Sequence, residues 1–420
     1  MRFPRSFLLV SLVVLTWSAD SQPFNYDESK VPKYKLPDPL LMESGESVKT
    51  VAQWRTQRRP ELLELFKTHV YGRDPGRPKD MTFFTLEQRH GVLNGLANRR
   101  QVEVRFAGRR DGPRMTILIY TPAKAKGPVP TFLGLNFRGN HTIHDDAAIL
   151  LPHSWVRGRT PGETVNNRAT EKGRGKAKNR WAVEMILKRG YGLAIIYYGD
   201  IDPDFDDGFK NGVHALYPKP KPDGWGSIAT WAWGLSRALD YLETNKTVDH
   251  RRVAVIGHSR LGKTALWAGA NDERFALVIS NNSGCGGAAL SRRAFGETVK
   301  RINTSFPHWF CDNFTKYNDN ESACPVDQHL LVALSAPRPV YIASATQDRW
   351  ADPHGEFLAA KYAAPVYSLL GAGNFPADKQ PPPDQPVVGA MGYHLRTGKH
   401  DVTDYDWARY LDFADQHLGK

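Results

Sequence analysis

The sequence predicts an α/β protein, on the order of its apolar runs and on one transition from strand to helix. Strand-like runs dominate the first third of the chain, whereas strands and helices alternate from residue 191 onward. The stretch "VAVIGHSRLGKTALWAG" at residues 253–269 then passes from a buried strand into a helix of small residues. This order predicts a three-layer α-β-α sandwich around a central, mostly parallel sheet, with loop insertions around the site.

The expected elements follow one another without an internal repeat. A helix is expected at 51–72, broken at Pro60. Strands are expected at 81–86, 100–106, 115–120, 129–136, 191–198, 253–256, 275–280 and 340–345, and helices at 228–244, 264–270 and 404–418.

The N-terminal residues predict export. Arg2 and Arg5 precede an apolar run at 7–17, and small residues follow, which is the pattern of a secretory signal peptide over residues 1–21. Since no other stretch is long and apolar enough to cross a bilayer, we expect a secreted or periplasmic protein without a membrane span. With 41% hydrophobic residues the chain can bury a large core. We interpret residues 22–420 as one catalytic domain with a Pro-rich, extended N-terminal arm at 22–46.

The net charge and the cysteine content exclude few classes of function. The net charge of +12 suits solubility and equally suits an acidic polysaccharide. The insertion at 157–180, with eight Lys or Arg and two Glu, is either a solvated face or the rim of a substrate groove. Cys311 and Cys324 are close enough in sequence for a disulfide, which leaves Cys285 over. The cysteine spacing matches no zinc site. We expect a monomer with no metal, no organic cofactor and no nucleic-acid partner.

Ser259 lies where a strand turns sharply into a helix between Gly257 and Gly262. This is the setting of a nucleophile elbow, the G-x-S-x-G turn of α/β-hydrolases, although here the second glycine comes one residue late. The alternative is that the serine only caps the helix.

A catalytic serine needs a base, and the base needs a group that orients it. In the α/β-hydrolase order the acid and the histidine follow the serine. Asp348 and Asp352 follow the strand at 340–345, and Asp352, before a proline, has the pattern of a helix cap. His394 and His400 lie in the interpreted loop before the last helix and compete for the role of base.

The motif G-x-S-R-x-G-K, present as Gly257, Ser259, Arg260, Gly262 and Lys263, resembles that of the glucuronoyl esterases of carbohydrate esterase family 15. The late glycine is part of this pattern. Further matching segments are "NSGCGGAALSRR", "GETV", "FPHWFC", "DRWADPHGEF" and "HLRTGKHDVTDYDW". The resemblance covers most of the chain from about residue 100.

The resemblance implies a role for each matching residue. Ser259 is the nucleophile, His400 the general base and Arg260 the support of the oxyanion. Lys263, Glu297 and Trp350 bind the glucuronoyl ring. Fungal members carry a glutamate where this chain has Asn282, so it resembles the bacterial members whose acid follows the later strand, here Asp348. The fungal elbow disulfide is absent, because its cysteine is replaced by His258.

The implied reaction is hydrolysis, through an acyl-enzyme, of the ester between 4-O-methyl-glucuronic acid side chains of glucuronoxylan and lignin alcohols. The implied enzyme is thus a carboxylic ester hydrolase of the 4-O-methyl-glucuronoyl methylesterase type. An acetyl xylan esterase and a non-catalytic carbohydrate-binding protein are the alternatives. Each site residue has a structural alternative too: Arg260 could pair with a carboxylate at the sheet end, Lys263 could be a solvated helix lysine, Glu297 a surface carboxylate and Trp350 a core or lid aromatic. His258 is expected to pack beneath the serine, and His308 and Trp309 could belong to the pocket wall.

Overall fold

A computed structural model describes residues 24–158 and 160–419, so the predicted signal peptide at 1–21 lies outside the described residues. Within them, one ten-stranded sheet has the order β1-β2-β3-β7-β4-β8-β9-β10-β12-β11. Its strands are β1 (Thr82–Gly91), β2 (Ala97–Arg105), β3 (Arg114–Pro122), β4 (Val129–Asn136), β7 (Gly192–Tyr197), β8 (Val248–His258), β9 (Leu277–Asn281), β10 (Val340–Ala345), β11 (Val387–Val388) and β12 (Met391–Arg396). β5 (Thr164–Val165) and β6 (Arg168–Ala169) form a separate hairpin.

The centre of the sheet is parallel and its first strands are antiparallel. β7, β4, β8, β9, β10 and β12 pair in parallel, with Leu133 of β4 opposite Ala194 of β7 and Val255 of β8. β1, β2 and β3 pair antiparallel, β3 joins β7 antiparallel, and β11 is antiparallel to β12. Because parallel strands end at the same edge of a sheet, the loops that follow β4, β7, β8, β9, β10 and β12 meet there.

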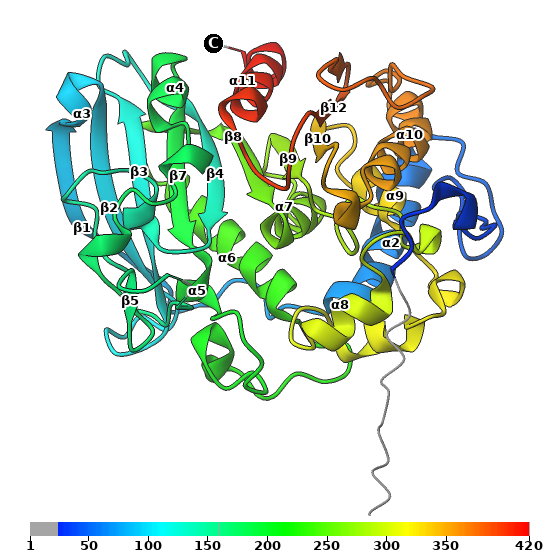
Figure 1. Cartoon of the computed structure of the whole chain (residues 1–420), viewed down its shortest axis with the longest axis horizontal. Helices are drawn as coiled ribbons and strands as arrows, with labels where there is room; N and C mark the ends of the chain where they lie inside the picture. Colours follow the sequence, from blue (N-terminus) through cyan, green and yellow to red (C-terminus); the bar gives the residue numbers. More distant parts are fainter. Residues whose placement is uncertain (1–23, 159, 420) are drawn as a thin grey trace, which may run out of the picture.

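Helices cover both faces of the sheet, which confirms the predicted three-layer sandwich. α4 (Val183–Lys188) and α11 (Asp404–Leu418) pack on one face through a core that includes Ile186, Trp407 and Phe413 (Figure 1). α2 (Arg59–Phe66), α6 (Ser227–Leu242), α7 (Arg260–Asn271), α9 (Gln328–Ala333) and α10 (Pro353–Leu369) pack on the other face in the larger core. The remaining helices are α1 (Val51–Gln53), α3 (Val92–Gly95), α5 (Tyr198–Ile201) and α8 (Val299–Ser305).

Most expected elements are present, and three have the predicted bounds: β4, β10 and α11. The break expected at Pro60 is wrong. Residues 51–71 form one helical run, in which α1 and α2 alternate with π-helical segments at Trp54–Arg58 and Lys67–Tyr71. Pro60 lies just after the π-helical segment Trp54–Arg58, and the helical backbone continues on both sides of it.

The interpretation of residues 392–407 as a loop is partly wrong, because Met391–Arg396 is strand β12. This segment has no β-branched residue and contains Gly392, so it lacks the usual strand signals. Pairing with β10 along its full length makes it a strand.

The expected Cys311–Cys324 disulfide is wrong, because Cys285, Cys311 and Cys324 are all buried free thiols. Burial raises the pKa of both Cys311 and Cys324 to about 12, so both are thiols at neutral pH. No helix in residues 24–158 and 160–419 is long and apolar enough to cross a membrane.

Candidate active site

Ser259 lies in a strained turn between β8 and α7. Its backbone has φ 59° and ψ −129°, a left-handed conformation that is rare for a residue with a side chain, and its N–H donates to the Asn281 carbonyl at 2.9 Å. A Cβ on Gly257 would lie 1.8 Å from the Leu261 carbonyl oxygen, and one on Gly262 would lie 3.0 Å from the Ser283 Cβ. The late glycine therefore lets α7 pack closely against the segment after β9.

Asp348 and His400 meet although 52 residues separate them. The His400 Nδ1 lies 2.6 Å from the Asp348 Oδ2, and the Asn282 side-chain amide donates to the same oxygen at 2.8 Å. Asp348 is buried, whereas the His400 side chain is 41% exposed. Because a carboxylate only accepts, Nδ1 must carry the proton, which leaves the Nε2 lone pair free to act as a base. Asn282, at the position where the resemblance implies a glutamate in fungal members, here donates to the carboxylate of Asp348.

The contact between His258 and His400 shows that the His400 ring lies next to the elbow. The two rings lie 4.4 Å apart between centroids, and His258 immediately precedes Ser259. His258 is buried, with Nδ1 2.6 Å from the Asn281 Oδ1. Burial, and then the neighbouring His400, lower the pKa of His258 well below its ordinary value, so the ring is neutral. As predicted, it packs at the elbow.

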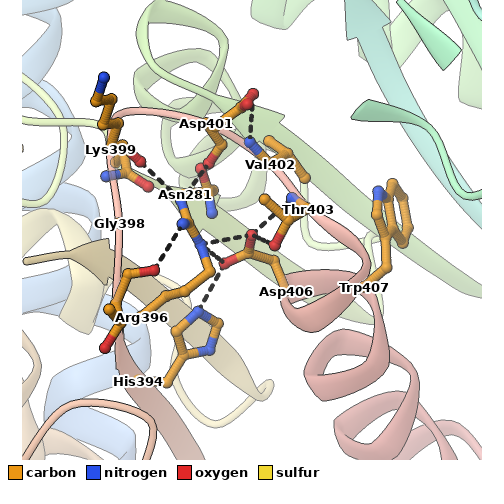
Figure 2. A network of polar contacts seen from close by, with 12 residues as sticks. Asn281, His394, Arg396, Gly398, Lys399, Asp401, Val402, Thr403, Asp406 and Trp407 are labelled. Atoms are coloured by element: carbon orange, nitrogen blue, oxygen red, sulfur yellow. Dashed lines mark hydrogen bonds and ion pairs between the residues drawn. The ribbon is translucent and has the colours of Figure 1, made fainter. Parts of the chain in front are cut away.

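The loop that holds His400 is tied down by its flanks. The Arg396 guanidinium donates to the Lys399 carbonyl at 2.8 Å and to the Asp401 carbonyl at 3.2 Å, one on each side of His400 (Figure 2). Its Nε lies 2.9 Å from Asp406, which also accepts from the Thr403 N–H at 2.7 Å. The loop is thus fixed at its start and at its end.

His394, the competing base, belongs to this support. Its Nε2 lies 2.9 Å from the Asp406 Oδ1, and the side chain is fully buried in β12 (Figure 2). Asp352 is likewise excluded as the acid. It is the N-cap of α10, accepts from the Gly355 N–H at 3.0 Å and pairs with Arg293 at 2.7 Å.

Arg260 follows Ser259 as the first residue of α7. Its Nη1 hydrogen-bonds the Asp204 carboxylate, and its guanidinium carbon lies 4.6 Å from the Trp309 ring centroid. Its Nε is buried and has no hydrogen-bond partner in the described part of the chain. The pairing with a carboxylate at the sheet end, one of the two alternatives, is therefore present.

The three predicted sugar-binding residues lie together. The Lys263 ammonium is buried and donates to the carbonyls of Ser283 and Cys285, both at 2.6 Å, and to the Glu297 carboxylate at 3.2 Å. Lys263 is therefore not a solvated helix lysine. The Glu297 N–H donates to the Trp350 carbonyl at 3.0 Å, and the Trp350 ring contacts Phe24 of the N-terminal arm edge-on at 4.7 Å.

Two supporting residues were not found from the sequence. Asp204 contacts residues far along the chain, and Arg396 donates to backbone carbonyls. Neither kind of contact can be recognised from a sequence motif. The one available signal is position, because Asp204 follows β7 and Arg396 ends β12, at the sheet edge where sites of α/β proteins lie. No group of three His, Cys, Asp or Glu side chains within the described ranges is arranged to hold a metal ion.

Comparison with known proteins identifies the family. Residues 194–371 match the family described as "Glucuronyl esterase, fungi". The chain is 56% identical to a promiscuous CE15 esterase from the marine bacterial metagenome, where CE15 is carbohydrate esterase family 15. That match covers 94% of this chain and all of the other, with a TM-score of 0.89. The chain belongs to carbohydrate esterase family 15. The family expected from the G-x-S-R-x-G-K motif is thereby confirmed, as is the α/β-hydrolase fold.

Two further relatives show that the similarity extends to other members of the family. The chain is 47% identical to the glucuronoyl esterase from Solibacter usitatus, over 93% of this chain and 99% of the other, with a TM-score of 0.88. It is 29% identical to the 4-O-methyl-glucuronoyl methylesterase of Phanerochaete carnosa, over 87% of this chain and 81% of the other.

Proposed function

We propose that this family 15 esterase is exported and hydrolyses esters that join 4-O-methyl-glucuronic acid side chains of glucuronoxylan to lignin alcohols. The observation that supports the proposal most is the Asp348–His400 pair, 2.6 Å apart, whose imidazole ring lies beside the strained Ser259 elbow. The names of the relatives support the uronic acid, and the pattern of residues 1–21 supports export.

The proposed reaction uses a nucleophile, a base and an acid. His400 takes the Ser259 hydroxyl proton on Nε2 as Oγ attacks the ester carbonyl, and the Asp348 carboxylate stabilises the resulting imidazolium. The tetrahedral intermediate collapses, the C–O bond to the alcohol breaks, and the alcohol leaves with the proton from His400. Water then cleaves the acyl-enzyme by the same steps and releases the uronate and free Ser259.

The oxyanion is stabilised by donors close to Ser259. The first N–H groups of α7 have no partner within the helix, and the helix places the positive end of its dipole there. Arg260 supplies a further N–H and a positive charge. Removal of one such donor typically costs about 2.7–4 kcal/mol of the barrier.

In this proposal Lys263, Glu297 and Trp350 bind the sugar. Since the Lys263 ammonium already donates to three oxygens, the sugar hydroxyls reach it by sharing or replacing the longest of these contacts, that with Glu297. Trp350 offers an aromatic surface of the kind on which a sugar face packs.

The substrate class is tested with purified mature protein on benzyl glucuronate and, in parallel, on acetylated xylan. We expect turnover of the uronate ester that is lost in Ser259→Ala, while the thermal unfolding midpoint of the variant stays unchanged. Activity on the acetyl substrate alone would overturn the proposal.

A broader esterase is the second candidate, and one observation favours it. The relative from the marine bacterial metagenome, 56% identical, is described as promiscuous. If this chain is similar, acetylated xylan is also cleaved, and the same Ser259→Ala substitution abolishes both activities.

A further inference from the structure

Asp204 is a buried carboxylate that the proposed reaction does not use. It follows α5, just beyond the end of β7. Its Oδ1 accepts from the Trp309 indole at 2.8 Å and lies 3.0 Å from the His308 Nε2, and its Oδ2 accepts from the Tyr198 hydroxyl at 3.0 Å and from Arg260. Burial opposes ionisation, but the hydrogen bond with His308 and the charge of Arg260 outweigh it and lower the pKa of Asp204. A carboxylate with this many donors is held in one orientation.

Arg260 is held between this carboxylate and three aromatic rings. Its guanidinium carbon lies 4.6 Å from the ring centroid of Trp309, 5.5 Å from that of Phe306 and 5.7 Å from that of Phe137. Phe306 and Trp309 are themselves stacked, 3.7 Å apart. Aromatic faces attract a guanidinium and restrict its rotation, so Arg260 has little rotamer freedom left to lose when substrate binds.

Among the described residues, Nη1 is the one guanidinium nitrogen of Arg260 with a hydrogen-bond partner. Nη1 is used on Asp204, while Nε is buried without a partner among residues 24–158 and 160–419. An oxygen that becomes negative in the transition state is stabilised most by N–H donors that are already fixed in place.

We propose that Asp204 is a positioning residue, which fixes the Arg260 guanidinium through Nη1 so that its other N–H groups are held ready for the substrate oxyanion beside Ser259. This inference rests on the proposed function, because it gives Arg260 a role in the transition state. It adds a residue that does not touch the substrate but sets the orientation of one that does.

A double-mutant cycle on the full mature protein tests the proposal. Kinetic constants for benzyl glucuronate are measured for the wild type, Asp204→Asn, Arg260→Ala and the double variant. We expect Asp204→Asn to lower kcat by at least about tenfold with KM changed less than about threefold, since the contact is made in the transition state. In the Arg260→Ala background the same substitution should change kcat by less than about twofold.

Asp202→Asn is the matched control. Asp202 is also buried, two residues earlier, and its carboxylate accepts from the Ser227 hydroxyl at 2.5 Å rather than from Arg260. Its replacement should leave kcat within about twofold. If Asp204→Asn does not fold, Asp204→Glu replaces it in the cycle, because it retains the charge but shifts the carboxylate by one methylene. The same dependence on Arg260 is expected.

The outcomes separate this inference from the proposed function. An equal loss of kcat in both backgrounds, or an unchanged kcat in Asp204→Asn, overturns the positioning role while Arg260 keeps its own. If Arg260→Ala itself leaves kcat unchanged, the oxyanion role of Arg260 fails and the inference fails with it. Hydrolysis that survives Ser259→Ala overturns the proposed mechanism as a whole.

Discussion

The proposed nucleophile and the proposed base of this esterase are held in place by different means. Ser259 is positioned by backbone alone, because β8, α7 and the close contact at Gly257 leave its turn one conformation. His400 is exposed on a loop and is positioned by side chains. Its ring contacts Asp348. Arg396 donates to the carbonyls of Lys399 and Asp401 on either side of it (Figure 2). A substitution that disturbs the backbone at the elbow should destabilise the fold. A substitution of a side chain that supports His400 should misalign the imidazole ring while the fold stays intact.

The first prediction has the largest expected effect and concerns Asp348, the residue that orients the proposed base. Asp348→Asn should lower kcat by roughly 10³–10⁴-fold, because asparagine neither holds the His400 tautomer nor stabilises the imidazolium. Kinetics on benzyl glucuronate measure it. Asp352→Asn is the control, since it breaks the buried ion pair with Arg293 and should lower stability but leave kcat within about threefold. Equal losses of kcat in the two variants would contradict the assignment of the acid.

The second prediction concerns the elbow. Gly257→Ala should destabilise the protein by more than about 3 kcal/mol, because its Cβ would overlap a backbone oxygen that cannot move without unwinding α7. Gly398→Ala in the His400 loop meets the end of the Arg396 side chain at 2.7 Å and no backbone atom, so it should cost less stability, although φ is +130°. Urea unfolding followed by circular dichroism distinguishes them. A smaller loss for Gly257→Ala than for Gly398→Ala would remove the basis of the comparison.

The third prediction concerns the clamp of the loop. Arg396→Lys retains a positive charge for Asp406 but cannot reach the carbonyls on both sides of His400, so kcat should fall about tenfold with a small change in the unfolding midpoint. Arg409→Lys on α11, where Arg409 pairs with Asp412, is the control and should leave kcat unchanged. An Arg396→Lys enzyme with full activity would show that Asp348 alone positions the base.

The fourth prediction is the smallest and concerns pH. Burial raises the pKa of Glu356, which accepts from the N–H groups of Ser283 and Gly284 beneath the acid, to about 7. At low pH both the folded and the unfolded protein carry the proton. As the pH rises from about 4.5 through 7 the unfolded state ionises first, so this group stabilises the fold less. Glu356→Gln should therefore gain stability relative to the wild type between pH 5 and pH 8, on the order of 1–2 kcal/mol in urea unfolding. A constant difference would contradict the raised pKa.

The same contrast explains what the sequence predicted. The elbow, the sheet core and α11 follow from local patterns, and the family motif accounts for the choice of Ser259, His400 and Asp348. β12 was missed because its strand character comes from its pairing with β10 and not from its residues, and with it the burial that removes His394 from the competition. Asp204 was missed because its role depends on contacts with distant segments, and Arg396 because it acts on backbone carbonyls, which any residue supplies. Spacing in the sequence does not contain that information.

The central claim is that an imidazole held by a buried carboxylate activates the hydroxyl at the β8–α7 turn. The most direct measurement is the rate at which a fluorophosphonate modifies that hydroxyl, followed by mass spectrometry of the peptide that contains residue 259. We predict a single adduct on Ser259 in the wild type and a rate at least about 10³-fold lower in His400→Ala. An adduct on another residue, or an unchanged rate in His400→Ala, would contradict the claim.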